Sequence, residues 1–219
     1  MLPRVSFDTQ RRELADACHR LAAAGLVIGT AGNLSVRTGN AVVVTPTGCV
    51  LAEVEPDAMT VVALDGDPAD DGPAPTSELG LHLGVYERFD WAEAVVHTHS
   101  PMATAVGCVV DELPAIHYQM LSLGGPVQVA PYATFGSDEL HAHVLAALEG
   151  HTAALMRNHG TLTCGTGLES AVEATFLLEW ACGLYWHAAQ IGTPSILTAE
   201  QLGDVAAQVQ RLGYGGAGG

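Results

Sequence analysis

The segment from Glu93 to Pro101 constrains the fold more than any other stretch of this 219-residue sequence. It begins with apolar, partly β-branched residues at 94–96 and ends at a proline, which predicts a short buried strand. Side chains alternate between the two faces of a strand, so His97 and His99 are predicted to lie on the same face, roughly 7 Å apart. Two imidazoles held on one rigid element form half of a metal site.

A second His-x-His pair in the same chain provides an internal comparison. His141 and His143 lie in a segment that begins with Ser137 and has apolar residues at helical spacing. On a helix, residues two positions apart point roughly 200° away from each other, so these two side chains cannot bind one ion together. We therefore expect solvated helix histidines there.

The composition excludes several classes of function. With 8 basic and 24 acidic residues the formal net charge is −16, which argues against binding to nucleic acid or to an anionic membrane surface. The sequence contains no lysine, so a Schiff base through a lysine amine and a P-loop are both excluded. No stretch approaches a transmembrane span, and no signal peptide is recognisable. Five scattered cysteines without a C-x-x-C pair suit reduced thiols, so we expect a cytoplasmic protein.

The remaining pattern predicts one domain over residues 1–212 and a flexible, glycine-rich tail over residues 213–219. Helices are predicted where apolar residues recur at helical spacing, and strands where short apolar runs meet turn residues. The predicted helices cover residues 9–24, 102–110, 137–150, 167–191 and 198–212, and a further helix starts at 75–78. The predicted strands cover residues 34–37, 41–44, 61–64, 94–96, 127–130 and 152–156.

Two loops of small residues lie at the ends of predicted paired strands, at Gly32-Asn33 and at Thr47-Gly48. Their backbone N–H groups and hydroxyls can form an anion-binding nest without cations. Ordinary turn chemistry is the simpler explanation for each loop taken alone.

The start of the helix at 75–78 allows two interpretations. With Thr76 or Ser77 as the cap, Glu78 falls in the first turn, where a carboxylate complements the helix dipole. Alternatively, the same helix start is a phosphate site and Glu78 points into a metal pocket. His159 follows a predicted strand, so three imidazoles and this carboxylate are expected to converge on one rim of the sheet.

Together these motifs resemble the class II, zinc-dependent aldolase family typified by L-fuculose-1-phosphate aldolase. The matching segments follow the family's order and spacing over nearly the whole chain, at residues 29–37, 45–48, 75–78, 97–99, 116–118, 130–136 and 158–160. The resemblance implies an α/β fold, a three-layer α/β/α sandwich around a mixed, mostly antiparallel sheet. It also implies a homotetramer with four-fold symmetry and active sites between subunits.

The resemblance implies a role for each residue that matches a family motif. The zinc ligands are matched by His97, His99, His159 and Glu78, and the carboxylate becomes the catalytic base when substrate displaces it. The phosphate-binding positions are matched by Gly32, Asn33, Thr47, Gly48, Thr76 and Ser77. Tyr118 matches the tyrosine that reaches a neighbouring subunit's site and handles the proton of the aldehyde oxygen. The family's C-terminal tyrosine has only a displaced candidate, Tyr214, whose role stays open.

The implied reaction is reversible cleavage of a small phosphorylated sugar, a ketose 1-phosphate, to dihydroxyacetone phosphate and an aldehyde. Because no lysine can form an imine, a Lewis acid has to stabilise the enediolate, and three neutral imidazoles leave the charge of Zn²⁺ largely intact. Cobalt and manganese remain open as alternatives to zinc, and the sequence leaves the aldehyde partner undetermined.

Three related functions compete with this interpretation. Sugar-phosphate 4-epimerases usually carry an aspartate where Tyr118 stands, and they have a longer C-terminus. Methylthioribulose-1-phosphate dehydratases commonly have an alanine where Ser77 stands. Non-catalytic scaffolds of the adducin type usually lose the zinc ligands, whereas all four candidates are present here. The residues therefore favour an aldolase.

Overall fold

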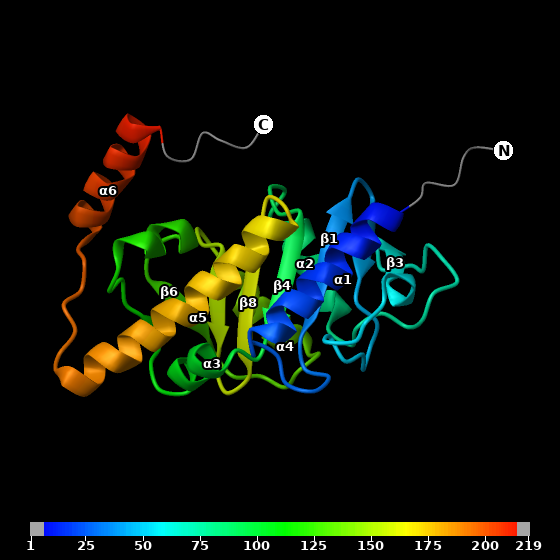
Figure 1. The fold of residues 1–219 in the computed structure, drawn as a ribbon, viewed down its shortest axis with the longest axis horizontal. Helices are drawn as coiled ribbons and strands as arrows, with labels where there is room; N and C mark the ends of the chain where they lie inside the picture. The colour runs from blue at the N-terminus through cyan, green and yellow to red at the C-terminus, as the bar shows by residue number, and fades with distance from the viewer. Residues whose placement is uncertain (1–6, 214–219) are drawn as a thin grey trace.

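The short apolar runs of the sequence pair into one mixed sheet, and helices cover both of its faces (Figure 1). The computed structural model describes residues 7–213. The strands are β1 (Asn33–Thr38), β2 (Ala41–Val44), β3 (Thr60–Ala63), β4 (Ala94–Thr98), β5 (Glu112–Leu113), β6 (Val127–Ala130), β7 (Ala153–Met156) and β8 (Gly160–Gly165). Their spatial order is β3-β2-β1-β4-β8-β7-β6-β5. Among these described strands, β6 and β7 pair in parallel and all other neighbours are antiparallel.

Six α-helices and two short 3₁₀ turns complete the described chain. They are α1 (Asp8–Ala23), η1 (Pro56–Ala58), α2 (Leu79–Arg88), α3 (Pro101–Gly107), η2 (Tyr118–Leu123), α4 (Asp138–Ala147), α5 (Leu168–Ile191) and α6 (Ala199–Leu212). The predicted three-layer α/β/α sandwich is confirmed. None of these helices combines the length and the apolar character that a membrane span requires. The predicted tail, apart from Gly213, lies outside the described residues.

The alternation of side chains along β4 distributes the core between the two layers. Val95 packs in a cluster with residues of α2 and α4, whereas Ala94 and Val96 pack on the opposite face with residues of α1 and α5. A third cluster joins α3, η2 and α5 to the β6–β7 end of the sheet. A strand buried on both faces is held rigidly, which suits an element that carries His97.

Strand β8 was not predicted, and its composition explains why. Its apolar side chains, Leu162 and Cys164, alternate with threonines, so the segment resembles a half-exposed strand or a loop. All six residues are nevertheless buried. The hydroxyl of Thr163 is 2.7 Å from that of Thr175 on α5, so a polar side chain is satisfied inside the core.

The predicted start of α2 is wrong by one or two residues. The helix begins at Leu79, so Glu78 occupies the N-cap position instead of the first turn, and neither predicted residue caps the helix. The hydroxyl of Thr76 instead accepts a hydrogen bond from the N–H of Glu78 at 3.3 Å. Because Glu78 lies outside the helix, its backbone dihedral angles (φ −100°, ψ 18°) differ from those of an α-helix.

Gly160 allows β4 and β8 to approach closely, and we predict that Gly160→Ala destabilises the fold. A Cβ atom at this position would overlap the carbonyl oxygen of Thr98 on the neighbouring strand. Overpacking of this kind lowers the free energy of unfolding by about 1–3 kcal/mol. Urea denaturation followed by circular dichroism measures the change.

Gly167→Ala is the matched control for this substitution. Gly167 has extended backbone (φ 179°) and no atom within 4 Å of an added Cβ, so alanine there is expected to be nearly neutral. Equal stability of the two variants would contradict the close-approach argument.

Candidate active site

Three histidines from two paired strands converge at one edge of the sheet. His97 lies on β4 and His99 follows that strand, whereas His159 directly precedes β8. The ligand nitrogens of all three lie within 4.8 Å of one another, and Nε2 of His97 is 3.1 Å from Nε2 of His99. The pairing of β4 with β8 produces this cluster, because it brings together segments about sixty residues apart in the sequence.

Hydrogen bonding fixes which nitrogen of His97 faces the cluster. Nδ1 of His97 lies 2.8 Å from the carbonyl oxygen of Thr161 on β8. A carbonyl only accepts, so Nδ1 carries a proton, and Nε2 is the nitrogen that faces the other two imidazoles and can bind a metal ion once it is deprotonated. Metal-binding histidines are commonly oriented in this way by a backbone carbonyl.

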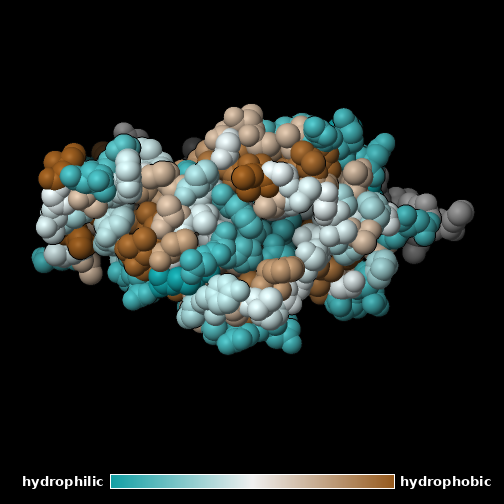
Figure 2. All heavy atoms as spheres, turned by 90° about the horizontal axis from the view of Figure 1, so that it is seen from below, coloured by the Kyte–Doolittle hydropathy of each residue, from teal (hydrophilic) through white to brown (hydrophobic). Residues whose placement is uncertain are grey.

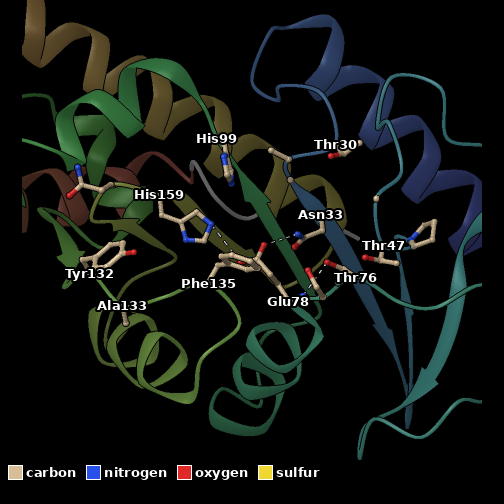
Figure 3. Close-up of a pocket in the computed structure, with 16 residues that line it drawn as sticks. Thr30, Asn33, Thr47, Thr76, Glu78, His99, Tyr132, Ala133, Phe135 and His159 are labelled. Atoms are coloured by element: carbon tan, nitrogen blue, oxygen red, sulfur yellow. Dashed lines mark hydrogen bonds and ion pairs between the residues drawn. The ribbon is translucent and has the colours of Figure 1, made fainter.

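Glu78 adds a carboxylate to the same point (Figure 3). Its Oε2 lies 3.1 Å from Nε2 of His97 and accepts a hydrogen bond from Nδ2 of Asn33 at 2.9 Å. Its Oε1 lies 3.6 Å from Nε2 of His159 and has no hydrogen-bond partner within residues 7–213, although the residue is only 7 % exposed. One oxygen of this carboxylate is therefore fixed, and the other is available to a ligand.

The donor set fits a divalent cation. Lone pairs of imidazole nitrogens and a carboxylate oxygen repel one another at about 3 Å unless a cation lies among them. Three imidazoles and one carboxylate are a ligand set that Zn²⁺ accepts. Within residues 7–213, His97, His99 and His159 are the group of side chains placed closely enough to bind such an ion.

The local environment favours the forms of these groups that bind metal. Burial lowers the pKa of His99 to about 4, and the neighbouring His97 and His159 contribute to that shift. Burial, followed by the charge of His97, also lowers the pKa of His159. Both imidazoles are therefore neutral at pH 7, which is the form that binds a metal ion.

Opposing effects determine the ionisation of Glu78. Burial alone would raise the pKa of its carboxyl group. The hydrogen bond and charge of His97, the amide of Asn33 and the charge of His159 together outweigh burial and hold that pKa well below its usual range. The carboxyl group is therefore an ionised carboxylate at neutral pH.

A cavity of about 370 Å³ opens beside the histidines. All of the residues predicted to bind an anion line it: Gly32, Asn33, Thr47, Gly48, Thr76 and Ser77. Gly32 (φ +108°) and Gly48 (φ +68°) have left-handed backbone, a conformation that glycine adopts without steric cost. Within residues 7–213 no arginine lines the cavity, so apart from His99 and His159 its polar donors are hydroxyl, amide and backbone N–H groups.

One predicted catalytic residue, Tyr118, does not line this cavity. Tyr118 lies at the start of η2, is 53 % exposed and is absent from the cavity lining. Its ring lies 4.6 Å from that of His117, which contacts the ring of Trp180 edge-on at 4.8 Å. Tyr214 lies outside the described residues.

The structure also adds residues to which the sequence analysis gave no role. Tyr132 and Phe135 follow β6 and contribute aromatic surface to the cavity, at 61 % and 68 % exposure (Figure 3). His82 lies behind Asn33 and contacts its side chain. A spacing of four residues from Glu78, which places two side chains on one side of a helix, was the signal in the sequence that could have indicated His82.

Residues 12–186 match the family described as Class II Aldolase and Adducin N-terminal domain. The chain belongs to the class II aldolase family. A 5-methylthioribulose-1-phosphate/5-deoxyribulose-1-phosphate aldolase of Rhodospirillum rubrum is 38 % identical over 194 residues, which cover 88 % of this chain and 87 % of that protein. An L-fuculose phosphate aldolase of Escherichia coli K12 is 35 % identical over 205 residues, with 92 % and 94 % covered.

A solved structure agrees with these relatives. An L-fuculose 1-phosphate aldolase superposes with a TM-score of 0.87 at 32 % identity, over 91 % of this chain and 95 % of that chain. The protein is therefore an aldolase, as predicted. Membership of the class II family implies a divalent metal ion, and the three-histidine cluster can bind one.

We predict that the metal-free class II aldolase loses stability as the pH falls from about 6.5, where histidines of an unfolded chain titrate. Burial lowers the pKa of His82 to about 3 and that of His99 to about 4 in the folded state. Below about pH 6.5 the unfolded chain therefore binds protons that the folded chain does not, so the free energy of unfolding decreases.

The urea midpoint of EDTA-treated protein, measured between pH 7 and about pH 5, tests this sign. Most carboxylates remain ionised over that interval, so the histidines dominate the change. A midpoint that stays constant or rises as the pH falls would show that these histidines are not held neutral.

Proposed function

We propose that this enzyme reversibly cleaves a ketose 1-phosphate to dihydroxyacetone phosphate and an aldehyde, with Zn²⁺ held by His97, His99 and His159. The observation that carries the proposal is the convergence of three imidazoles with a carboxylate that has one open oxygen. The cavity beside them offers neutral donors suited to a phosphate. The relatives named above act on ketose phosphates, as their names state.

The metal ion supplies Lewis-acid stabilisation of the negative charge that develops on the substrate's ketone oxygen. Glu78 is the fourth group within reach of the ion and, in the proposed mechanism, the catalytic base. In the synthetic direction its Oε1 accepts the proton from the carbon next to the ketone. That oxygen has no hydrogen-bond partner among the described residues, so no hydrogen bond has to break.

Burial raises the pKa of Glu78 and its polar contacts lower it, which suits a base whose contacts change during the reaction. Its pKa is lowered mainly by contact with His97, whereas burial raises it. A carboxylate that loses contact with His97 on substrate binding, yet remains buried, becomes more basic beside the C–H bond.

We assign the phosphate to the two glycine loops and the residues that precede α2. Gly32, Thr47, Gly48, Thr76 and Ser77 line the cavity and contribute backbone N–H groups and hydroxyls. The side-chain amide of the sixth predicted residue, Asn33, is already bonded to Glu78. We therefore propose that this side chain positions the carboxylate, while the other five hold the phosphate.

Aromatic surface beside the metal site favours substrates with an apolar end. Tyr132 lies on the side of the cavity away from Thr47, and Phe135 lies in its middle beside Glu78, both with exposed rings (Figure 3). The sugars named for the relatives end in a methyl or a methylthio group, which such rings can bind by apolar contact. We propose a ketose 1-phosphate of this kind, similar to L-fuculose 1-phosphate.

We further propose a cytoplasmic homotetramer with four-fold symmetry, in which Tyr118 acts in the site of a neighbouring subunit. In its own subunit this tyrosine is exposed and away from the cavity. Hydrophobic residues are exposed at the end of the molecule that carries the C-terminal part of α5 and α6, among them Trp186, Ile191 and Ile196 (Figure 2). Subunit contact would remove this surface from water. The cysteines of the described chain are free, as in a reducing compartment.

Proton exchange tests the proposed base. Wild-type enzyme with zinc should exchange a C–H proton of dihydroxyacetone phosphate into deuterated water without any aldehyde, as followed by NMR. Glu78→Gln should retain zinc and slow this exchange by roughly 10²–10⁴-fold, because a positioned base is lost. EDTA should abolish wild-type exchange, and added zinc should restore it.

Glu139→Gln provides the matched control, because Glu139 is an acidic residue in the first turn of the neighbouring helix α4. It should leave exchange unchanged. Exchange at the wild-type rate in zinc-loaded Glu78→Gln would remove Glu78 from the mechanism. Exchange that persists in metal-free protein would overturn the metal-dependent reaction.

Subunit mixing tests the role of Tyr118. Tyr118→Phe and His97→Ala proteins should each be inactive in cleavage, because one lacks the proton donor and the other a metal ligand. Exchange of subunits between them should recover part of the activity, since some sites then combine an intact cluster with an intact tyrosine from a neighbour. Absence of recovery despite demonstrated subunit exchange would place Tyr118 in its own subunit's site or outside catalysis.

A further inference from the structure

A chain of buried hydrogen bonds extends from Glu78 into the core. Asn33 donates from Nδ2 to Oε2 of Glu78, and its Oδ1 lies 2.6 Å from Nε2 of His82. Nδ1 of His82 lies 2.7 Å from the hydroxyl of Ser35, which lies 2.7 Å from the hydroxyl of Tyr86. All five side chains belong to buried residues, and His82 is 0 % exposed.

Two regular elements build this chain. Asn33 and Ser35 are two residues apart on β1 and therefore point to the same face of the sheet. Glu78, His82 and Tyr86 are spaced by four residues along the N-cap and body of α2, so they lie on the side of the helix that faces β1. The hydrogen bonds consequently link a rigid strand to a rigid helix.

The orientation of the Asn33 amide, with Nδ2 towards Glu78 and Oδ1 towards His82, determines the direction of every hydrogen bond in the chain. A carboxylate only accepts, so the NH₂ group of Asn33 faces it and the amide oxygen faces His82. That oxygen also only accepts, so His82 carries its proton on Nε2. The buried imidazole is neutral, so its bare Nδ1 accepts from Ser35, whose oxygen in turn accepts from Tyr86.

We propose that His82 is a positioning residue for the catalytic base. By donating from Nε2, it prevents the Asn33 amide from turning over and presenting its oxygen to Glu78. The amide then occupies Oε2, which leaves Oε1 as the oxygen that receives the substrate proton. This inference rests on the proposed function, because it assigns His82 a task in the same proton transfer.

The two nitrogens of His82 can be replaced separately. In His82→Gln the side-chain amide nitrogen reaches about as far as Nε2 and can still donate to Asn33. In His82→Asn the shorter side chain reaches only the position of Nδ1, so the oxygen of Asn33 loses its donor. His82→Gln is therefore expected to rescue the function that His82→Asn removes.

Zinc-loaded variants are compared in the exchange of dihydroxyacetone phosphate protons into deuterated water. His82→Asn should lower kcat by about 10–100-fold, the usual effect of removing a group that orients a ligand or catalytic residue, without an equivalent rise in KM or loss of zinc. His82→Gln should retain most of the rate. In the wild-type protein, ¹⁵N NMR of labelled histidines should show His82 as the neutral Nε2–H tautomer.

Thr175→Val is the control for a general loss of stability. It removes a buried hydrogen bond to Thr163 on the opposite face of the sheet, so it should lower the unfolding temperature without lowering kcat. Equal rates for His82→Asn and His82→Gln, or an Nδ1–H tautomer, would overturn the positioning role while leaving the proposed function intact. Absence of exchange in the wild-type enzyme would instead overturn the proposed function, and the positioning role with it.

Discussion

The contact between β4 and β8 is the constraint on which the site depends. Gly160 lies against the carbonyl oxygen of Thr98, and the register aligns His97 with Leu162. Because this glycine has no side chain, the two strands approach closely enough for His159 to lie beside His97 on β4 and His99 just after it. The rigidity of the ligand cluster is therefore the rigidity of a central strand pair buried on both faces.

Few positively charged side chains are available to bind an anion at the site. The chain has a formal net charge of −16, and no arginine of the described part of the chain lines the cavity. Under the proposed function, a phosphorylated substrate would be held by hydroxyls, backbone N–H groups and the start of a helix, together with a metal ion. Such binding would explain why small residues surround the site. Glycine and threonine allow backbone N–H groups to approach a ligand closely, whereas a long basic side chain would hold the backbone away from it.

The two oxygens of Glu78 have different surroundings, and the second row of side chains behind the site creates that difference. Asn33 bonds one oxygen, and the core polar chain through His82 orients Asn33 in turn. The other oxygen faces His159 and the cavity. Burial of Asn33, His82, Ser35 and Tyr86 is tolerated because each of these side chains has a hydrogen-bond partner, which avoids the cost of an unsatisfied buried polar atom.

Short-range patterns of apolar and polar residues were sufficient to predict which face of a strand or helix several histidines occupy. The apolar run before His97 and the proline after His99 define a strand, and strand alternation places both imidazoles on one face. Helical spacing around His141 and His143 separated that pair in the same way, and α4 is indeed a helix there. These inferences succeeded because the periodicity of side chains depends only on residues that are close in the chain.

Contacts between distant segments were decided by the tertiary structure alone. The imidazole of His97 is oriented by Thr161, 64 positions away, and the amide of Asn33 by His82, 49 positions away. Strand β8 was not predicted because its threonines find hydrogen-bond partners on other elements. Glu78 occupies the N-cap position of α2 instead of the first turn, and there its carboxylate contacts Asn33 and His97. Sequence patterns specify which face a side chain occupies, but only the packing of strands and helices specifies which other side chains it meets there.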